Sequence, residues 1–241
     1  LARALALKPG ALLLDEPLAS LDENLRKQMQ AEVTRIQKEL GVTTIFVTHN
    51  QEEAMTMSDR IVIMNEGKFE QQGSPTEVYH HPDSLFVADF IGKANIFRGP
   101  VTDVQDGIAA VDTTVGRLRG TVSDESEPLE EGKKVGVVVR PEVMTLVARD
   151  EMTPEDDTNV VEGEVNLAQM LGDIIEYRVY TEDGFEILAT LPSSEEQARR
   201  FERGDAVDIH FPEHASKVIG KESTIRESTE DAIATGVQHE R

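Results

Sequence analysis

Two short apolar runs flank one long amphipathic segment in the first 50 residues. Residues 11–15 read Ala-Leu-Leu-Leu-Asp without alternation, which is typical of a strand buried on both faces of a parallel sheet. From Leu21 to Leu40, apolar residues recur at steps of three and four, which predicts one apolar stripe along a helix. Residues 43–48 are rich in β-branched side chains and predict a second buried strand. Strand, helix and strand at these lengths indicate a βαβ unit with a parallel sheet.

Capping residues suggest where the helices begin and end. Ser20 and Glu23 have the spacing of a capping box, so we expect Ser20 to be the N-cap of the long helix. Gly41 is expected to end that helix in a left-handed conformation. Asn50 is expected to cap a short helix that runs to about Ser58.

The next segment predicts a hairpin and two short helices. Residues 60–64 and 69–72 read as strands joined by a tight turn. The run 74–77, Ser-Pro-Thr-Glu, is a strong helix start, with an N-cap, a proline at the first helical position and a glutamate two residues later. A second helix is expected to open at Pro82 and to end at Gly92.

The chain changes character at about residue 95, where short β-rich runs begin to alternate with turn residues. This spacing indicates an all-β barrel or a pair of small barrels. The predicted strands are 96–104, 108–114, 117–122, 134–140, 143–147, 160–169, 174–181, 185–191 and 206–211. We therefore predict three parts, an α/β part over residues 1–94, a β-rich part over 95–221, and an acidic flexible tail over 222–241.

Composition limits the class of protein. A chain of 241 residues with 39% hydrophobic content has room for two domains with cores of their own. No apolar run approaches the roughly 20 residues of a membrane span. The absence of cysteine excludes disulfides and thiolate metal sites, and it fits a reducing cytosol. Because Leu1 begins inside an apparent helix, we expect these residues to be the C-terminal fragment of a longer protein.

The net charge of −22 is concentrated in the second half of the chain. Residues 1–95 carry 9 Lys and Arg against 14 Asp and Glu, and residues 96–241 carry 15 against 32. Phosphate backbones require clustered Lys and Arg, so we expect no nucleic-acid partner. Either cationic partners or a surface adapted to a salty cytoplasm would account for the acidity, and we favour the second.

Three ionisable residues are expected at one edge of the parallel sheet. Asp15 and Glu16 follow the first strand, and His49 follows the second. Ligands of α/β proteins bind at the carboxyl ends of such strands, so the set suggests a divalent metal and an activated water. Taken singly, each has a plain alternative, because acids often begin turns and a histidine after a strand is often a loop residue. Asp22 could simply favour a helix N-terminus electrostatically.

The order of the motifs resembles the second half of an ABC-type ATPase domain. Leu-Leu-Leu-Asp-Glu-Pro at 12–17 resembles the Walker B motif, Ser-Leu-Asp at 20–22 the D-loop, and Thr-His at 48–49 the switch-histidine segment. The resemblance implies a P-loop NTPase-type α/β fold with a parallel sheet, followed by an all-β OB-like barrel. It also implies ATP and Mg²⁺ as cofactors.

The same resemblance implies a role for each site residue. Asp15 would hold Mg²⁺ through a water, because a hard cation that bridges phosphates prefers carboxylate oxygen. Glu16 would polarise the attacking water as general base. His49 would donate a hydrogen bond to the γ-phosphate and sense its loss. Asp22 would lie across a dimer interface and join two nucleotide sites.

Longer runs narrow the resemblance to importer ATPases. The runs 47–65 (VTHNQEEAMTMSDRIVIMN) and 73–79 (GSPTEVY) look like the group that serves polyamines, ferric iron and sugars. Residues 86–92 (FVADFIG) and 94–97 (ANIF) resemble the spermidine/putrescine importers most closely. The β-rich part resembles the transport-associated OB-like (TOBE) domain of these ATPases, with Arg-Pro-Glu at 140–142 in a typical turn position.

The resemblance implies an ATP-hydrolysing, translocase-type subunit on the cytoplasmic face of the cell membrane. Its partners would be transmembrane permease subunits, a second copy of itself in a homodimer and, indirectly, a solute-binding protein. These residues contain no Gly-x-x-x-x-Gly-Lys-Ser/Thr phosphate loop and no Leu-Ser-Gly-Gly-Gln signature, so we expect residues 1–241 alone to be inactive.

Three alternatives remain open from the sequence. The first is a ferric iron or sugar importer of the same group. The second is an ATPase of DNA repair or chromosome maintenance, which the absence of sustained heptads and of a basic face disfavours. The third is a ligand-sensing module whose ATPase half is vestigial, which the presence of both Glu16 and His49 disfavours.

Overall fold

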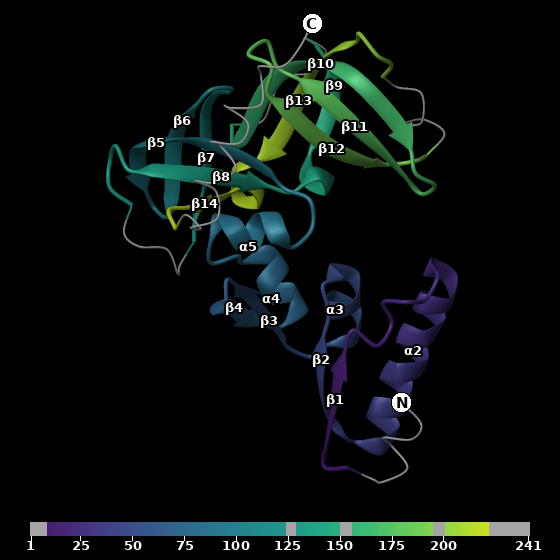
Figure 1. The fold of residues 1–241 in the computed structure, drawn as a ribbon. Helices are drawn as coiled ribbons and strands as arrows, with labels where there is room; N and C mark the ends of the chain where they lie inside the picture. The colour runs from purple at the N-terminus through teal and green to yellow at the C-terminus, as the bar shows by residue number, and fades with distance from the viewer. Residues whose placement is uncertain (1–8, 124–128, 150–155, 195–200, 222–241) are drawn as a thin grey trace, which may run out of the picture. The chain divides into compact units, whose positions relative to one another are not determined.

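The chain forms two units, Leu1–His80 and His81–Arg241 (Figure 1). The computed structural model describes residues 9–123, 129–149, 156–194 and 201–221. The helix predicted over residues 1–7 and the tail predicted over 222–241 lie outside the described residues.

The first unit opens with the predicted βαβ arrangement. Strands β1 (Ala11–Asp15) and β2 (Thr43–Val47) pair in parallel, with Asp15 opposite Val47. Helix α2 (Glu23–Leu40) connects them and runs alongside the pair (Figure 1). Leu12 of β1 and Val33 of α2 are both buried, as the apolar stripe requires.

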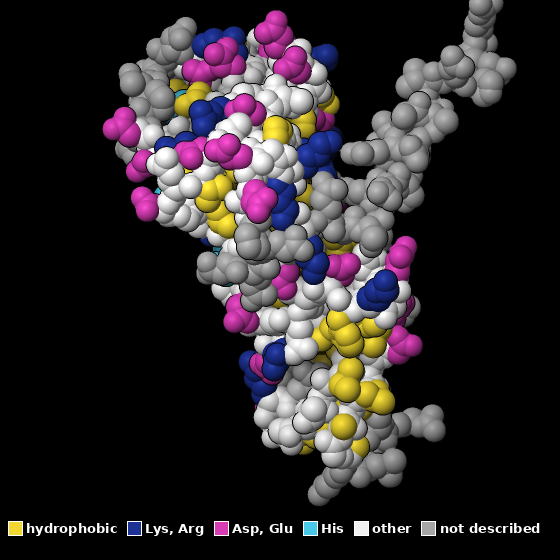
Figure 2. Space-filling model, turned by 90° about the vertical axis from the view of Figure 1, so that its left-hand side faces the viewer, with side chains coloured by type: hydrophobic (Ala, Val, Ile, Leu, Met, Phe, Trp, Pro, Cys, Tyr) yellow, Lys and Arg dark blue, Asp and Glu magenta, His cyan; other side chains and the backbone are white. Residues whose placement is uncertain are grey.

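The prediction that these strands are buried on both faces is wrong for the described residues. One face of the pair packs toward α2, whereas Leu13, Ile45 and Val47 on the other are 72%, 56% and 54% exposed. The reason is that the sheet has two strands and one covered face here. Hydrophobic side chains accordingly gather on the surface of this unit (Figure 2). A two-stranded pair with an open apolar face is marginal in water and favours further packing partners.

The N-cap of α2 is Asp22, so the prediction of Ser20 is wrong. The Asp22 carboxylate accepts a hydrogen bond from the backbone N–H of Leu25 at 3.0 Å. The chain turns twice before the helix, because the N–H of Ala19 bonds to Glu16 and that of Leu21 to Leu18. Those turns shift the helix start by two residues. The other end is as predicted, since Gly41 is left-handed, with φ of 60°.

The remaining elements of this unit are confirmed. Asn50 caps helix α3 (Gln51–Met57), accepting a hydrogen bond from the N–H of Glu53. Strands β3 (Ile61–Asn65) and β4 (Lys68–Gly73) form the hairpin. Helix α4 (Pro75–His80) has the full capping box, because Ser74 and Glu77 each bond to the other's backbone N–H.

The second unit contains a closed five-stranded barrel and a separate five-stranded sheet, which confirms the predicted β-rich part. The barrel order is β14-β7-β6-β5-β8, and the sheet order is β12-β11-β10-β13-β9. The barrel strands are β5 (Asn95–Gln105), β6 (Ile108–Thr113), β7 (Gly116–Val122), β8 (Lys134–Val139) and β14 (Lys217–Ile219). The sheet strands are β9 (Thr145–Ala148), β10 (Thr158–Met170), β11 (Ile174–Tyr180), β12 (Glu186–Pro192) and β13 (Ala206–Pro212). Two short 3₁₀ turns, η1 (Pro141–Val143) and η2 (Glu213–Ala215), precede β9 and β14.

One hydrophobic core joins the barrel to the sheet. Phe97 of β5 stacks on Phe211 of β13, with ring centroids 6.0 Å apart and planes 2° from parallel. Both side chains are fully buried. The continuous core explains why these strands form one unit rather than two.

Two buried asparagines add hydrogen bonds between the barrel and the sheet. Each side-chain amide bonds to the backbone N–H and the backbone carbonyl of one residue, as a neighbouring strand would. The Asn95 amide accepts from the N–H of Leu188 and donates to the carbonyl of the same residue, each at 2.8 Å. Asn159 forms the same doubled bond with Arg119, at 2.7 and 2.8 Å. Each side chain thus pairs with one backbone donor and one backbone acceptor at a partly buried position.

Replacing Asn95 with Leu is expected to destabilise this unit by about 2–4 kcal/mol, because it orphans both backbone groups of Leu188. Denaturant unfolding followed by circular dichroism measures the change. Gln105→Leu, at an exposed position of the same strand, is the control and is expected to leave the unfolding midpoint in place. Equal midpoints for the two variants would contradict the bridging role.

The boundary between the units lies at residues 80 and 81, ahead of the predicted boundary at 94 and 95. Helix α5 (Leu85–Phe90) lies in the second unit because Leu85 and Ala88 pack in a cluster with Val138 and Ile219. A side chain at Gly136 would stand 2.6 Å from the Leu85 side chain, so the glycine makes room for the helix.

Candidate functional site

Glu16 and His49 meet at the carboxyl edge of the β1–β2 pair, as the parallel topology predicts. The imidazole Nδ1 of His49 lies 3.2 Å from the Oε1 atom of Glu16. Both side chains remain open to solvent, with His49 74% and Glu16 50% exposed. A carboxylate and an imidazole in this contact can exchange a proton or hold a polar ligand between them.

Glu16 has a left-handed backbone, with φ of 42°. This conformation costs a residue with a side chain about 1–3 kcal/mol, and such outliers gather at functional sites. The N–H of Glu16 donates to the carbonyl of Val47 at 2.9 Å, which continues the parallel ladder one residue beyond the strands. The ladder therefore fixes the position of the Glu16 backbone relative to the turn that carries His49.

Asp15 and Asp22 have different surroundings. Asp15 ends β1, and its side chain is exposed at the same sheet edge. Asp22 caps α2 by accepting a hydrogen bond from the N–H of Leu25. The alternative prediction, that Asp22 favours a helix N-terminus, therefore accounts for this contact. An exposed capping carboxylate can still contact a partner molecule, because a carboxylate has several acceptor positions.

In the part of the chain that the structure describes, no three His, Asp or Glu side chains stand close enough to hold a metal ion by themselves. Asp15 can supply one carboxylate to a hard cation such as Mg²⁺, which commonly keeps waters and binds phosphate oxygens in its other positions. The donor chemistry of the edge therefore fits Mg²⁺ held together with a phosphate ligand.

Sequence reasoning missed a group of residues behind this edge. Glu53 of α3 is only 3% exposed, and its carboxylate accepts a hydrogen bond from the hydroxyl of Thr48 at 2.7 Å. The Nε atom of Arg26, on α2, lies 3.7 Å from the same carboxylate. The spacing of these residues along the chain gave no signal, because the contacts join two helices and a turn.

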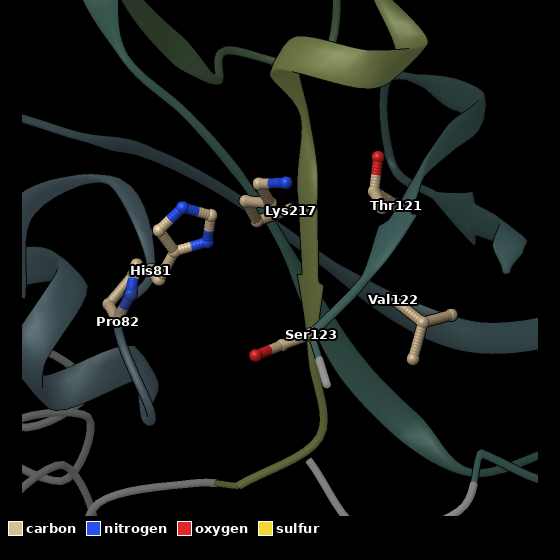
Figure 3. A pocket seen from close by; sticks show the side chains of 6 residues that line it. All are labelled: His81, Pro82, Thr121, Val122, Ser123 and Lys217. Atoms are coloured by element: carbon tan, nitrogen blue, oxygen red, sulfur yellow. The ribbon is translucent and has the colours of Figure 1, made fainter. Parts of the chain in front are cut away.

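The second unit contains a separate small hollow with a volume of about 80 Å³. Figure 3 shows the His81 ring, the Lys217 side chain and the Ser123 hydroxyl around it, while Val122 points away. Pro82 and Thr121 complete the lining. The lining contains no carboxylate and none of the predicted site residues, so the hollow has no part in the site at the β1–β2 edge.

No helix within the described ranges is both long enough and apolar enough to cross a bilayer.

Comparison with known proteins first gives a family match within the β-rich part. Residues 137–218 match the TOBE domain family. Among solved structures, the cytoplasmic molybdate-binding protein ModG aligns over 53% of this chain and 95% of its own, at 19% identity and a TM-score of 0.48.

Relatives extend the match across most of the chain. The spermidine/putrescine import ATP-binding protein PotA of Ruegeria pomeroyi is 40% identical over 221 residues, which is 91% of this chain and 57% of that protein. PotA of Thermobifida fusca is 39% identical over 91% of this chain and 56% of its own length. PotA of Desulfitobacterium hafniense is 47% identical over 68% of this chain and 45% of its own length. The chain thus spans about half the length of these curated relatives, and the predicted resemblance to importer ATP-binding proteins with a TOBE domain is confirmed.

Proposed function

We propose that residues 1–94 form the water-activating and switching half of the nucleotide site of an ABC-type importer ATPase. The observation that carries the proposal is the contact of Glu16 with His49 at the carboxyl edge of a parallel strand pair. Open α/β sheets bind their ligands at this edge. The names of the similar proteins, ATP-binding proteins of import systems, support the same assignment.

In this proposal each edge residue has one task. Glu16 is the general base that orients and polarises the attacking water, and its exposed carboxylate is open to that water. His49 donates a hydrogen bond to the γ-phosphate and reports its loss, with the Glu16 contact orienting the ring. Asp22 contacts the second nucleotide site across the dimer.

Asp15 is the proposed Mg²⁺ residue, acting through a water. When bound, Mg²⁺ neutralises charge on the β- and γ-phosphates. Asp15 is suited to this position because it ends β1 on the exposed edge, one residue from the proposed base. Carboxylate oxygen is the ligand type that this hard cation prefers.

The open apolar face of the β1–β2 pair supports a larger α/β sheet of the P-loop type. Leu13, Ile45 and Val47 would be covered by further strands and helices that carry the phosphate loop and the signature loop. Residues 1–241 contain neither loop, so the complete site requires other chain segments and, in a homodimer, a second copy.

The β-rich residues 95–221 form the transport-associated part in this proposal. The complete protein would bind transmembrane permease subunits on the cytoplasmic face of the membrane and serve a solute-binding protein indirectly. Opening of the dimer after hydrolysis would move the permease. The proposed solute is a polyamine, because three similar proteins are named as spermidine/putrescine import proteins. Ferric iron or a sugar is the second candidate.

Loss of the gene that encodes these residues is expected to reduce high-affinity spermidine uptake to the background level. The measurement is the initial rate of uptake of radiolabelled spermidine, with labelled ferric iron and a labelled sugar in parallel cultures. Re-expression of the wild-type protein is expected to restore spermidine uptake. A defect confined to the uptake of iron or of the sugar would identify that compound as the solute. Normal uptake of all three would contradict the importer function.

A further inference from the structure

Glu53 is a buried carboxylate between the two turns that carry the proposed site residues. Its side chain is 3% exposed and belongs to the first turn of α3. Burying a carboxylate without partners is costly, so its contacts must compensate for lost hydration. Those contacts lie toward His49 on one side and toward Asp22 on the other.

On the first side, Glu53 fixes the turn that contains His49. Thr48, the residue before the histidine, donates its hydroxyl hydrogen bond to Oε2 of Glu53 at 2.7 Å. The same hydroxyl oxygen accepts from the N–H of Asn50, the residue after the histidine, at 2.9 Å. Asn50 in turn accepts from the N–H of Glu53 at 3.2 Å. Both neighbours of His49 are therefore tied to Glu53, Thr48 through its carboxylate and Asn50 through its backbone N–H.

On the second side, Arg26 connects Glu53 to the turn that precedes α2. Its Nη2 atom donates to the carbonyl of Leu21, the residue before Asp22, at 2.6 Å. Its Nε atom lies 3.7 Å from Oε1 of Glu53 and, among the described residues, is buried without a hydrogen bond. A movement of about 0.7 Å would bring this pair to ordinary hydrogen-bond length. The distance between Arg26 and Glu53 can therefore shorten to a hydrogen bond when the two turns move toward each other.

We propose that Glu53 and Arg26 are positioning residues that hold the His49 turn and the Asp22 turn in one geometry. This inference rests on the proposed function, because it assigns the two turns to the γ-phosphate and to the dimer partner. The network links them within one subunit, so a displacement of His49 reaches Asp22 through two side chains. Neither Glu53 nor Arg26 touches the nucleotide in this scheme.

Glu53→Gln in the complete natural protein tests the positioning role. The amide still accepts from Thr48 but no longer attracts Arg26, so we expect kcat for ATP hydrolysis to fall by up to about 100-fold. We expect KM for ATP to stay close to wild type, because the substitution removes no nucleotide contact. Glu52→Gln is the matched control, since Glu52 is the exposed neighbour on the same helix and pairs only loosely with Lys27, at 3.9 Å. An unchanged kcat in Glu53→Gln would overturn the inference.

Thr48 and Arg26 variants separate positioning from loss of stability. We expect Thr48→Val to lower kcat. We expect Thr48→Ser to keep kcat close to wild type, because serine keeps the hydroxyl that bonds to Glu53. The double variant Thr48→Val with Arg26→Met is expected to be less impaired than the product of the two single effects, since both act through one carboxylate. Thermal unfolding midpoints identify variants that merely unfold, and independent, multiplicative effects would overturn the inference. If the wild-type protein itself fails to hydrolyse ATP, the proposed function has failed instead.

Discussion

Replacing Glu16 with Gln is expected to abolish steady-state ATP hydrolysis by the complete natural protein while leaving ATP binding intact. The amide keeps the shape of the side chain but cannot take a proton from water, so we expect a loss of about 10²–10⁴-fold in turnover. Because hydrolysis opens the dimer in the proposed cycle, ATP-bound dimers should accumulate. Phosphate release measures turnover, and size-exclusion chromatography with ATP and Mg²⁺ measures the dimer.

Glu66→Gln is a closely matched control for this substitution. Glu66 is also an exposed glutamate with a left-handed backbone, with φ of 48° against 42° for Glu16, but it lies in the turn between β3 and β4. We expect this variant to keep wild-type turnover. Retained turnover in Glu16→Gln would remove Glu16 from the role of general base, and a vestigial ATPase half would then become the better explanation.

The elements of the chain could be predicted where a pattern is local. The apolar stripe of α2 and the box at Ser74 and Glu77 depend on residues three or four positions apart, so one window contains all the information. The β-rich runs were recognised for the same reason. Strand β14 was missed because its three residues are too short for a pattern, although it closes the barrel by pairing with β7 and β8.

The start of α2 was misplaced because two acceptable caps stand close together. Ser20 and Asp22 are both strong N-cap residues, and only Ser20 has a glutamate at the spacing of a capping box. The turns from Glu16 to Leu21 decide in favour of Asp22, and Glu16, which begins them, has a left-handed backbone. The backbone turns before the helix, which a capping-box pattern does not reveal, therefore decide this boundary.

Some contacts of the candidate site could be predicted from the sequence, and others could not. The meeting of Glu16 and His49 followed from topology, because the ends of neighbouring parallel strands share one edge. The Arg26–Glu53–Thr48 contacts did not, because they depend on how α2 packs against α3 and on which rotamers reach across. The same holds for Asn95 and Leu188, which bond to each other from positions 93 residues apart. Contacts of this kind have no signature in a single sequence.

Replacing His49 with Ala is expected to lower ATP turnover by about 10²–10³-fold, as the loss of one well-placed hydrogen-bond donor at the reacting phosphate does. The effect differs from that of Glu16→Gln in its rescue pattern. His49→Gln keeps a side-chain N–H and is expected to recover part of the activity, whereas no amide can replace the base at Glu16. Binding of ATP, measured by fluorescence titration of a labelled analogue, should remain similar in all of these variants.

His80→Ala controls for the removal of an imidazole from the same unit. His80 is exposed at the end of α4, where its ring contacts Tyr79 edge-on, and it takes no part in the proposed site. We expect wild-type turnover for this variant. If His49→Ala also keeps wild-type turnover, the Glu16 contact at 3.2 Å is only a surface contact, which contributes little in solution. If His49→Ala loses both turnover and ATP binding, His49 holds the bound nucleotide in place and does not act as a sensor of hydrolysis.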